Sequence, residues 1–253
     1  MRVISIVNHK GGVGKTMTAH NLGAALAAKK KRVLLVDFDP QANLTSHCAV
    51  DVQNGEVKTI STYLNDDDVK VEPVGVVKNL HLIPAGDTLD QDSLDIAAMT
   101  NPKEAISLLK EILGRVGEYD FCLIDCAPGS GMLMLNSLCA ATEVIIPVYD
   151  KDALKGAQKI GGIIRQNGFK PSVLYLTTRY NEGISVHREL REYMEGECPE
   201  LLYHTIIRQC EALNQAACNE KDIFQYDARC NGAKDYAALA REVIGRGKRN
   251  EML

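Results

Sequence analysis

Residues 1–16 read MRVISIVNHKGGVGKT, and this stretch decides the fold. Val3–Val7 form a nearly continuous apolar run, which is typical of a strand buried on both faces. A glycine-rich turn follows, and from about residue 15 to 28 apolar residues recur at helical spacing. A buried strand, a glycine-rich turn and a helix, in that order, form the setting in which proteins build a phosphate-binding loop.

The turn almost fits the usual phosphate-loop pattern, G-x-x-x-x-G-K-[ST]. Gly14, Lys15 and Thr16 supply the end of that pattern, but His9 stands where its first glycine is expected. In such a loop we expect Lys15 to reach the β- and γ-phosphates of a nucleotide and the Thr16 hydroxyl to ligate Mg²⁺. The alternative is a tight connection without a ligand, because glycine-rich turns often serve only that purpose.

Lys10 is a second cation in a loop that already has a lysine. One interpretation is a surface lysine surrounded by water. The other is a side chain that points away from its own loop and meets a phosphate across a dimer interface. There it would neutralise charge that develops in the transition state, as an arginine finger does in other enzymes.

The alternation of strands and helices continues along the chain. It predicts a single-domain, doubly wound α/β fold over residues 1–253, with a mostly parallel sheet and helices on both faces. We expect the acidic run at 65–68, within the polar stretch 51–78, to be a surface loop. The further predicted strands are Val33–Val36, Leu80–Ile83, Phe121–Ile124, Val144–Val148 and Val173–Leu176, and the further predicted helices cover about 102–116, 131–140, 152–166, 185–195 and 232–245.

Carboxylates follow two of the predicted strands. Asp37 and Asp39 end the second strand, and Asp125 ends the strand at 121–124. We expect Asp125 to hold Mg²⁺ through water, Asp39 to orient the attacking water or contribute to the metal site, and Asp37 to support the Mg²⁺ shell. Many phosphate-loop ATPases place a glutamate directly after the Asp125 position, and Cys126 here favours Asp39 for the water. A turn or capping role before Pro40 is the alternative for Asp39.

Composition narrows the class of protein. The formal net charge of −4 gives no overall attraction to nucleic acid or anionic membrane, so DNA binding would need a local basic patch. No apolar run is long enough to span a bilayer, and we expect no secretory signal before the first strand. The eight cysteines include no C-x-x-C pair, which favours reduced thiols in a cytosolic protein; they are Cys48, Cys122, Cys126, Cys139, Cys198, Cys210, Cys218 and Cys230.

Three motifs together resemble those of the ParA/MinD family of deviant Walker A ATPases: KGGVGKT (10–16), DFDPQAN (37–43) and LIDCAP (123–128). The segments IIRQCEALNQA (206–216) and DIFQYDARCNGAKDYAALAREV (222–243) are similar to the closing segments of the small ParA/Soj branch. The tail GRGKRNEML (245–253) is polar and too short for a membrane-binding amphipathic helix, so it does not resemble MinD. The resemblance covers nearly the whole chain.

This resemblance implies a Mg·ATP-dependent ATPase that forms a homodimer with ATP, in which Lys10 reaches the partner subunit's nucleotide. It implies catalytic roles for Lys10, Lys15 and Asp39, and Mg²⁺ binding by Thr16, Asp39 and Asp125, partly through water. It places the base pocket around Thr178–Arg179 and Ile207–Arg208. The nucleotide-binding residues that it implies are Lys10, Gly11, Gly12, Val13, Gly14, Lys15, Thr16, Met17, Arg179, Ile207 and Arg208.

The partners that the resemblance implies are non-specific DNA and a ParB-type centromere-binding protein, with no membrane. The place would be the cytoplasm, at the nucleoid if DNA binding holds. The chain departs from the family pattern at Ala127–Gly131, at VYDKDALKGA (148–157), and at Glu211 or Ala212, where DNA-binding members are often basic. Positioning of a protein cargo, or a metal- or iron–sulfur-carrying role, are the alternatives. The basic clusters are patches for DNA or solvated faces, and comprise Lys29–Arg32, Arg188 with Arg191, and Arg246, Lys248 and Arg249.

Overall fold

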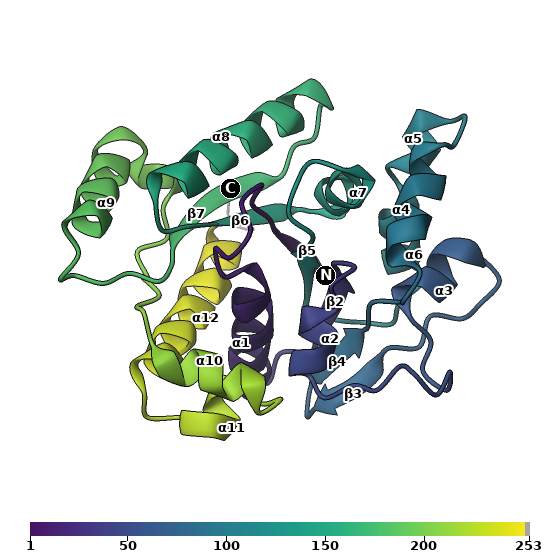
Figure 1. The fold of residues 1–253 in the computed structure, drawn as a ribbon, viewed down its shortest axis with the longest axis horizontal. Coiled ribbons are helices and arrows are strands. Elements are labelled where there is room, and N and C mark those ends of the chain that lie inside the picture. The colour runs from purple at the N-terminus through teal and green to yellow at the C-terminus, as the bar shows by residue number, and fades with distance from the viewer. Residues whose placement is uncertain (251–253) are drawn as a thin grey trace.

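The computed structural model describes residues 1–250, with side chains up to residue 246. Its centre is a seven-stranded sheet in the order β3-β4-β2-β5-β1-β6-β7 (Figure 1). All neighbouring strands are parallel except the pair β3–β4. The strands are β1 (Arg2–Ile6), β2 (Val33–Phe38), β3 (Val74–Val77), β4 (Leu80–Ile83), β5 (Phe121–Cys126), β6 (Glu143–Val148) and β7 (Ser172–Thr177).

Helices cover both faces of this sheet (Figure 1), and apolar residues are buried on each face, in one cluster on the first and in two on the other. On one face, α1 (Lys15–Ala28) packs against α12 (Asn231–Asn250), with α10 (Glu211–Cys218) and α11 (Ile223–Asp227) beside them. The opposite face carries most of the remaining helices, which are α3 (Ile60–Asn65), α4 (Leu89–Ala97), α5 (Pro102–Ala105), α6 (Leu108–Gly114), α7 (Met132–Ala140), α8 (Lys151–Gln166) and α9 (Ser185–Glu197).

The central strands explain why the sequence folds this way. Every residue of β2 and of β5 is buried, as expected of parallel strands covered by helices on both faces. Alternate side chains of β2 enter the two cores, so that Leu35 faces α1 while Leu34 and Val36 face α3 and α6. The predicted α/β fold with a mostly parallel sheet is therefore confirmed. The extent of a single domain over 1–253 stays a prediction.

All six strands expected from the sequence are present, within one or two residues of the predicted bounds. The acidic run at 65–68 is exposed, as predicted. The stretch 51–78 is not one loop, however, because it contains α3 and the antiparallel edge strand β3. The short helix α2 (Asn43–His47) and the helices α4, α10 and α11 were also not expected.

The predicted helix at 102–116 is divided in two. The Asn101 side chain caps the single turn of α5 by accepting from the N–H groups of Lys103 and Glu104. Ser107 then interrupts the helix, because its hydroxyl donates to the Glu104 carbonyl, 3.1 Å away. Serine competes in this way with the helix backbone, and α6 starts anew at the next residue.

The C-terminal helix α12 continues to Asn250, so the first part of the polar tail at 245–253 is helical. Residues 251–253 of that tail lie outside the described chain, and so do the side chains of Lys248 and Arg249. Among the helices of residues 1–250, none is both long and apolar enough to cross a membrane.

Candidate nucleotide site

The glycine-rich turn between β1 and α1 takes the form of an open cradle. Gly12 and Gly14 have φ angles of 71° and 91°, in the left-handed region where a side chain is strained. A Cβ atom added at Gly11, Gly12 or Gly14 would find no other atom within 4 Å, so the space beside the backbone is open. Gly14 also caps the N-terminus of α1. The helix dipole and the free N–H groups of its first turn therefore face this space, which suits an anion.

Asn8 fixes the start of the cradle. It is fully buried, and its side-chain amide donates to the carbonyls of Pro147 (2.8 Å) and Ala153 (3.0 Å). Its Oδ1 accepts from the backbone N–H of Lys10 at 3.0 Å. Gly156 permits this arrangement, since a Cβ there would lie 2.3 Å from Asn8 Oδ1. The loop is thus tied to the end of β6 and the start of α8.

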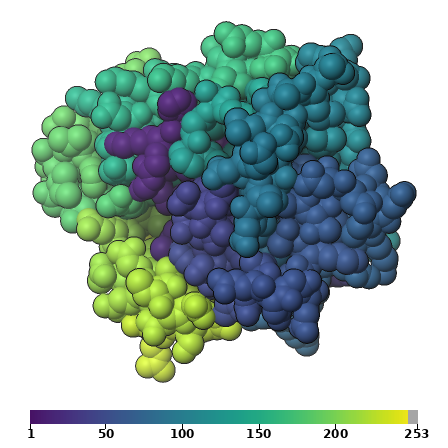
Figure 2. Space-filling model, turned by 45° about the vertical axis from the view of Figure 1, so that its right-hand side comes forward, coloured from purple at the N-terminus to yellow at the C-terminus, as the bar shows by residue number. Residues whose placement is uncertain are grey.

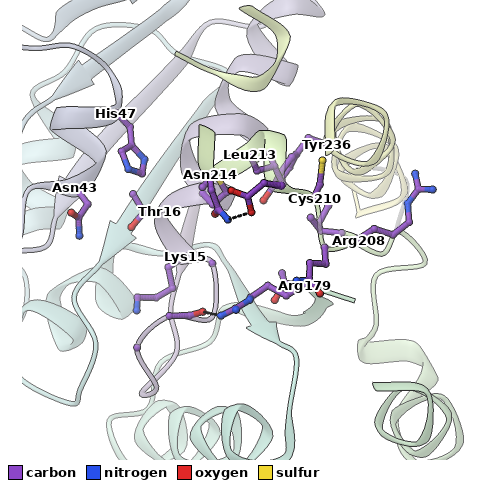
Figure 3. A pocket seen from close by; sticks show the side chains of 18 of the residues that line it. Lys15, Thr16, Asn43, His47, Arg179, Arg208, Cys210, Leu213, Asn214 and Tyr236 are labelled. Atoms are coloured by element: carbon purple, nitrogen blue, oxygen red, sulfur yellow. Dashed lines mark hydrogen bonds between the residues drawn. The ribbon is translucent and has the colours of Figure 1, made fainter. Parts of the chain in front are cut away.

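The cradle opens into a cavity of about 560 Å³, a size that accommodates a nucleotide. Figure 2 shows the purple N-terminal segment at the surface, where it lies between a teal-green segment and an indigo segment of the chain. The structure brings most of the predicted nucleotide residues together around this cavity, namely Gly11, Gly12, Gly14, Lys15, Thr16, Met17, Asp39, Arg179, Ile207 and Arg208. Lys15 and Thr16 face the same hollow as Cys210 and Asn214 (Figure 3).

The backbone carbonyls of two predicted residues, Gly12 and Val13, accept hydrogen bonds beside the cavity. Val13 is fully buried, and its carbonyl accepts from the Thr178 hydroxyl at 2.9 Å. The Arg179 guanidinium donates to the Gly12 carbonyl at 3.0 Å. These two bonds attach the segment after β7 to the cradle, so they connect the side wall of the cavity directly to its phosphate end.

Asp37 and Asp125 lie opposite each other in the register of β2 and β5. One oxygen of Asp37 accepts from the backbone N–H (2.8 Å) and the hydroxyl (2.7 Å) of Thr45. Within the described residues, neither side-chain oxygen of Asp125 has a hydrogen-bond partner, although the side chain is fully buried. Two acidic groups at this depth, one of them unpaired, indicate a place for a cation.

Burial raises the pKa of Asp125 well above its usual value, and the charge of Asp37 adds to this effect. The nearby groups of Thr16 and Lys15 oppose it. Burial is also the main cause that raises the pKa of Asp37, against the hydrogen bonds from Thr45. A divalent cation next to Thr16 would lower both pKa values and stabilise the ionised carboxylates. The residues present therefore fit Mg²⁺, which proteins commonly hold with one or two carboxylates plus nucleotide phosphates.

Asp39 lies at the cavity wall rather than behind it. It is 7% exposed, and one of its oxygens accepts from the backbone N–H of Gln41 at 3.0 Å. This bond is the turn-forming role that the sequence left open for Asp39. It uses one carboxylate oxygen, so a second role at the cavity is compatible with it.

Lys10 lies outside the cavity lining and is not a freely solvated lysine. Its Nζ atom is 2.5 Å from Asp150 Oδ2 and 4.9 Å from the centre of the Tyr149 ring. The hydrogen bond to Asp150 is the main cause that raises the pKa of Lys10. The guanidinium of Arg179 also lies over the Tyr149 ring, 4.8 Å from its centre. The sequence stretch at 148–157 that departs from the family pattern thus contains the residues that hold Lys10.

The base end of the cavity is built largely by residues that the sequence did not identify. Ile207 is buried, and Arg208 turns away from the phosphate loop (Figure 3) and binds Asp235 at 2.6 Å. The motif DFDPQAN contained a signal for two of the unpredicted lining residues, but no pattern pointed to the others. The unpredicted lining residues are Gln41, Asn43, His47, Pro128, Gln209, Cys210, Glu211, Leu213, Asn214 and Tyr236.

The cysteines and the other side chains of types that can ligate metals form neither disulfides nor a metal-binding cluster in residues 1–250. All eight cysteines are free thiols. Across residues 1–250, no group of three or more His, Cys, Asp and Glu side chains is arranged to hold a metal ion alone. A Mg²⁺ ion at Thr16 and Asp125 would depend on nucleotide phosphates and water for its remaining ligands.

A parallel sheet with this cradle between β1 and α1, and with an unpaired carboxylate at the end of β5, defines a P-loop nucleoside triphosphatase. The sequence model of the AAA domain family AAA_31 matches residues 1–169. The sporulation initiation inhibitor protein Soj of Bacillus subtilis is 35% identical, with 97% of this chain and 99% of that protein covered. The chain belongs to the ParA/MinD family of P-loop ATPases.

Two further relatives agree with this assignment. The chromosome-partitioning ATPase Soj of Treponema pallidum is 34% identical, with 97% of this chain and 98% of that protein covered. The structure of a plasmid partition protein from Borrelia burgdorferi bound to AMPPNP matches with a TM-score of 0.82 and 25% identity, over 97% of this chain and 99% of that one. The predicted family, ATPase activity and cofactors, ATP and Mg²⁺, are confirmed.

Proposed function

We infer that this protein is a DNA-partitioning ATPase that uses Mg·ATP as a switch for dimerisation. The ATP-bound homodimer binds DNA without sequence preference, and a ParB-type partner stimulates hydrolysis, which releases the subunits. The relatives named as partitioning proteins support this function. The observation that carries it is the position of Lys10, whose ammonium group is held outside the cavity of its own subunit.

The residues of one subunit account for binding of the nucleotide. In our proposal, the backbone N–H groups of residues 11–17, including that of Val13, surround the phosphates, and Lys15 binds the β- and γ-phosphates. Thr16 and Asp125 would hold Mg²⁺, which would withdraw charge from the phosphates. Met17, Arg179, Ile207 and Arg208 form the wall towards the base.

Asp39 is the carboxylate that we assign to the attacking water. It borders the cavity on the phosphate side, whereas Asp37 is occupied by Thr45 and lies deeper. Position 126, directly after Asp125, is a fully buried cysteine, so it offers no base to a water molecule in the cavity. Asp39 thus orients the water, and Lys15 and the partner subunit's Lys10 supply positive charge that the transition state needs.

DNA binding needs exposed cations, and the structure reduces the number of candidates. Arg191 is buried, and its guanidinium binds Thr177, the Tyr203 carbonyl and Glu195. Arg246 is bonded to the Leu202 carbonyl and Glu242. Among the described side chains of the predicted clusters, Lys29–Arg32 and the exposed Arg188 remain as candidates. Because each dimer would present both copies, dimerisation doubles the number of phosphate contacts available to these cations.

DNA binding by the purified protein tests this function. We expect Mg·ATP to produce a DNA complex that weakens steeply between 50 and about 200 mM salt, as electrostatic binding does. Asp39→Ala should prolong the complex by blocking hydrolysis, and ADP should not support it. Dimers that form with ATP yet ignore DNA at low salt would contradict partitioning of DNA. They would indicate instead an ATPase that positions a protein cargo.

The ion pair between Lys10 and Asp150 leads to a second prediction, which concerns the strength of ATP-dependent dimerisation. Asp150 uses Oδ2 for Lys10 and Oδ1 for the backbone N–H of Ala153, where it caps α8. Asp150→Asn keeps a capping oxygen and removes the charge that holds Lys10. A dimer releases two such pairs, each worth about 0.2–1 kcal/mol, so ATP-dependent dimerisation should strengthen by about 2–30-fold.

Analytical ultracentrifugation with Mg·ATP measures this effect. Asp152→Asn is the matched control, because Asp152 lies in the first turn of the helix that Asp150 caps and, among the described side chains, pairs with the exposed Lys155 alone. Equal dimerisation constants for Asp150→Asn and the control would show that the pair does not restrain Lys10.

A further inference from the structure

Tyr149, directly after β6, is in contact with two cations that come from distant parts of the chain. The Nζ atom of Lys10 is 4.9 Å from the centre of its ring, and the guanidinium carbon of Arg179 is 4.8 Å from the same point. Both distances are within the range in which a cation is attracted to an aromatic face. One ring therefore contacts a lysine outside the nucleotide cavity and an arginine that lines it.

The backbone holds Arg179 in a conformation that a large side chain rarely adopts. Its φ angle is 50°, in the left-handed region, where a residue other than glycine is strained. The flanking residues fix this conformation through their N–H groups, since Thr178 donates to the last carbonyl of β6 at 2.9 Å and Tyr180 donates to the Ile207 carbonyl at 3.1 Å. Strain that the surrounding structure imposes in this way is common at functional sites.

The Arg179 side chain makes two contacts from this position. Its guanidinium points to the glycine-rich turn (Figure 3), where it donates to the Gly12 carbonyl at 3.0 Å, and it also lies over the Tyr149 ring. His187 packs against the same ring, perpendicular to it, with the two ring centres 6.5 Å apart. His187 is itself held in place, because its Nδ1 accepts from the Asn181 N–H at 3.1 Å. The Tyr149 ring is therefore held on several sides and can fix the guanidinium against the turn.

We propose that Tyr149 is a positioning residue for both cations, whose ring keeps Arg179 at the glycine-rich turn for nucleotide binding and keeps Lys10 withdrawn beside Asp150. The aromatic face carries this role. Tyr149 lies in the stretch 148–157, which departs from the family pattern, and the family resemblance implies no role for it. The part about Lys10 rests on the proposed function, in which this lysine acts on the partner's nucleotide, whereas the part about Arg179 needs only nucleotide binding.

Nucleotide binding by the monomer tests the part that concerns Arg179. Tyr149→Leu keeps an apolar side chain but removes the aromatic face, so we expect it to weaken Mg·ADP binding about two- to fivefold, the effect of losing one exposed cation–π contact. Tyr149→Phe should restore native affinity. In an Arg179→Gln background, Tyr149→Leu should have no further effect, because the cation on which the ring acts is absent. Isothermal titration calorimetry measures these affinities, and Tyr193→Leu, at an exposed tyrosine of α9, is the matched control.

Chemical labelling without nucleotide tests the part that concerns Lys10. The N-hydroxysuccinimide ester of acetic acid acetylates amines, and mass spectrometry of peptides measures the rate at each lysine. We expect Tyr149→Leu to raise the rate at Lys10 about two- to fivefold, since one of the contacts that restrain its ammonium group is lost. The rate at Lys155, an exposed lysine of α8, should be the same in all variants and serves as the internal control. Tyr149→Phe should label at the native rate.

Three results would overturn the proposal. If Tyr149→Phe is as impaired as Tyr149→Leu, the hydroxyl rather than the aromatic face holds the cations. If Tyr149→Leu weakens Mg·ADP binding equally with and without Arg179, the ring acts on the site by another route. Native affinity or native labelling of Lys10 in Tyr149→Leu would show that the ring does not position that cation. A failure of ATP-dependent dimerisation or DNA binding would contradict the proposed function and leave both readouts intact, because neither readout needs a dimer.

Discussion

Replacement of Lys15 by alanine should abolish measurable ATP binding, with a loss of affinity of about 100-fold or more. Lys15 is the first residue of α1 and faces the cavity beside Thr16, where the helix N-terminus already favours an anion. Charge-assisted hydrogen bonds to phosphate contribute about 1.5–3 kcal/mol each, and the ammonium group can make more than one. Alanine leaves the backbone cradle in place but removes this charge.

Isothermal titration calorimetry with Mg·ATP measures the loss, and circular dichroism shows whether the variant is folded. Lys110→Ala, at an exposed position of α6, is the matched control and should bind ATP as the native protein does. Unchanged affinity in Lys15→Ala would mean that the nucleotide phosphates lie elsewhere.

Replacement of Lys10 by alanine should leave ATP binding nearly unchanged but abolish dimerisation and steeply reduce turnover, unlike the replacement of Lys15. ATP binding by the monomer should change by less than about threefold, because Lys10 contacts Asp150 and Tyr149 outside the cavity. Dimerisation with ATP should be lost. Turnover should fall by about 1,000-fold, which is the lower end of what a cation supplied across an interface contributes to phosphoryl transfer.

Sedimentation, ATP titration and a phosphate-release assay together separate these effects. Lys155→Ala is the control, since Lys155 is an exposed lysine of α8 with a similar surface ion pair. Native levels of dimerisation and hydrolysis in Lys10→Ala would exclude the role across the interface. A loss of monomer ATP binding would instead place Lys10 in its own subunit's site.

The sequence alone predicted the frame of the fold and pointed to the residues that we propose for the phosphate end of the site, for identifiable reasons. Continuous apolar runs such as Val33–Val36 have few alternatives to a buried parallel strand, and the structure confirms each of them. Motif spacing located Lys15, Thr16 and Asp125 because strand ends in such a sheet meet at one edge. These signals are local, and each is contained in fewer than ten residues.

The features that the sequence did not predict depend on contacts between distant segments. Asn8 meets the carbonyls of residues 147 and 153, and Gly156 is required only because Asn8 approaches it. The partner of Lys10 is 140 residues away in the chain. The short helices between residues 43 and 97 have five to nine residues each and gain their stability from packing rather than from propensity.

Hydrogen bonds at the start of α8 connect Lys10 to a helix that lies at the protein surface. Asn8 ties the backbone of Lys10 to the carbonyl of Ala153, and Asp150, the cap of the same helix, holds its side chain. Beyond this first turn, α8 presents Lys155 and Lys159 to solvent. A protein that docked on this exposed side and displaced the helix by a fraction of an ångström would shift Lys10 without contacting the nucleotide. The surface of α8 and the position of the Lys10 side chain would then be coupled through the first turn of that helix.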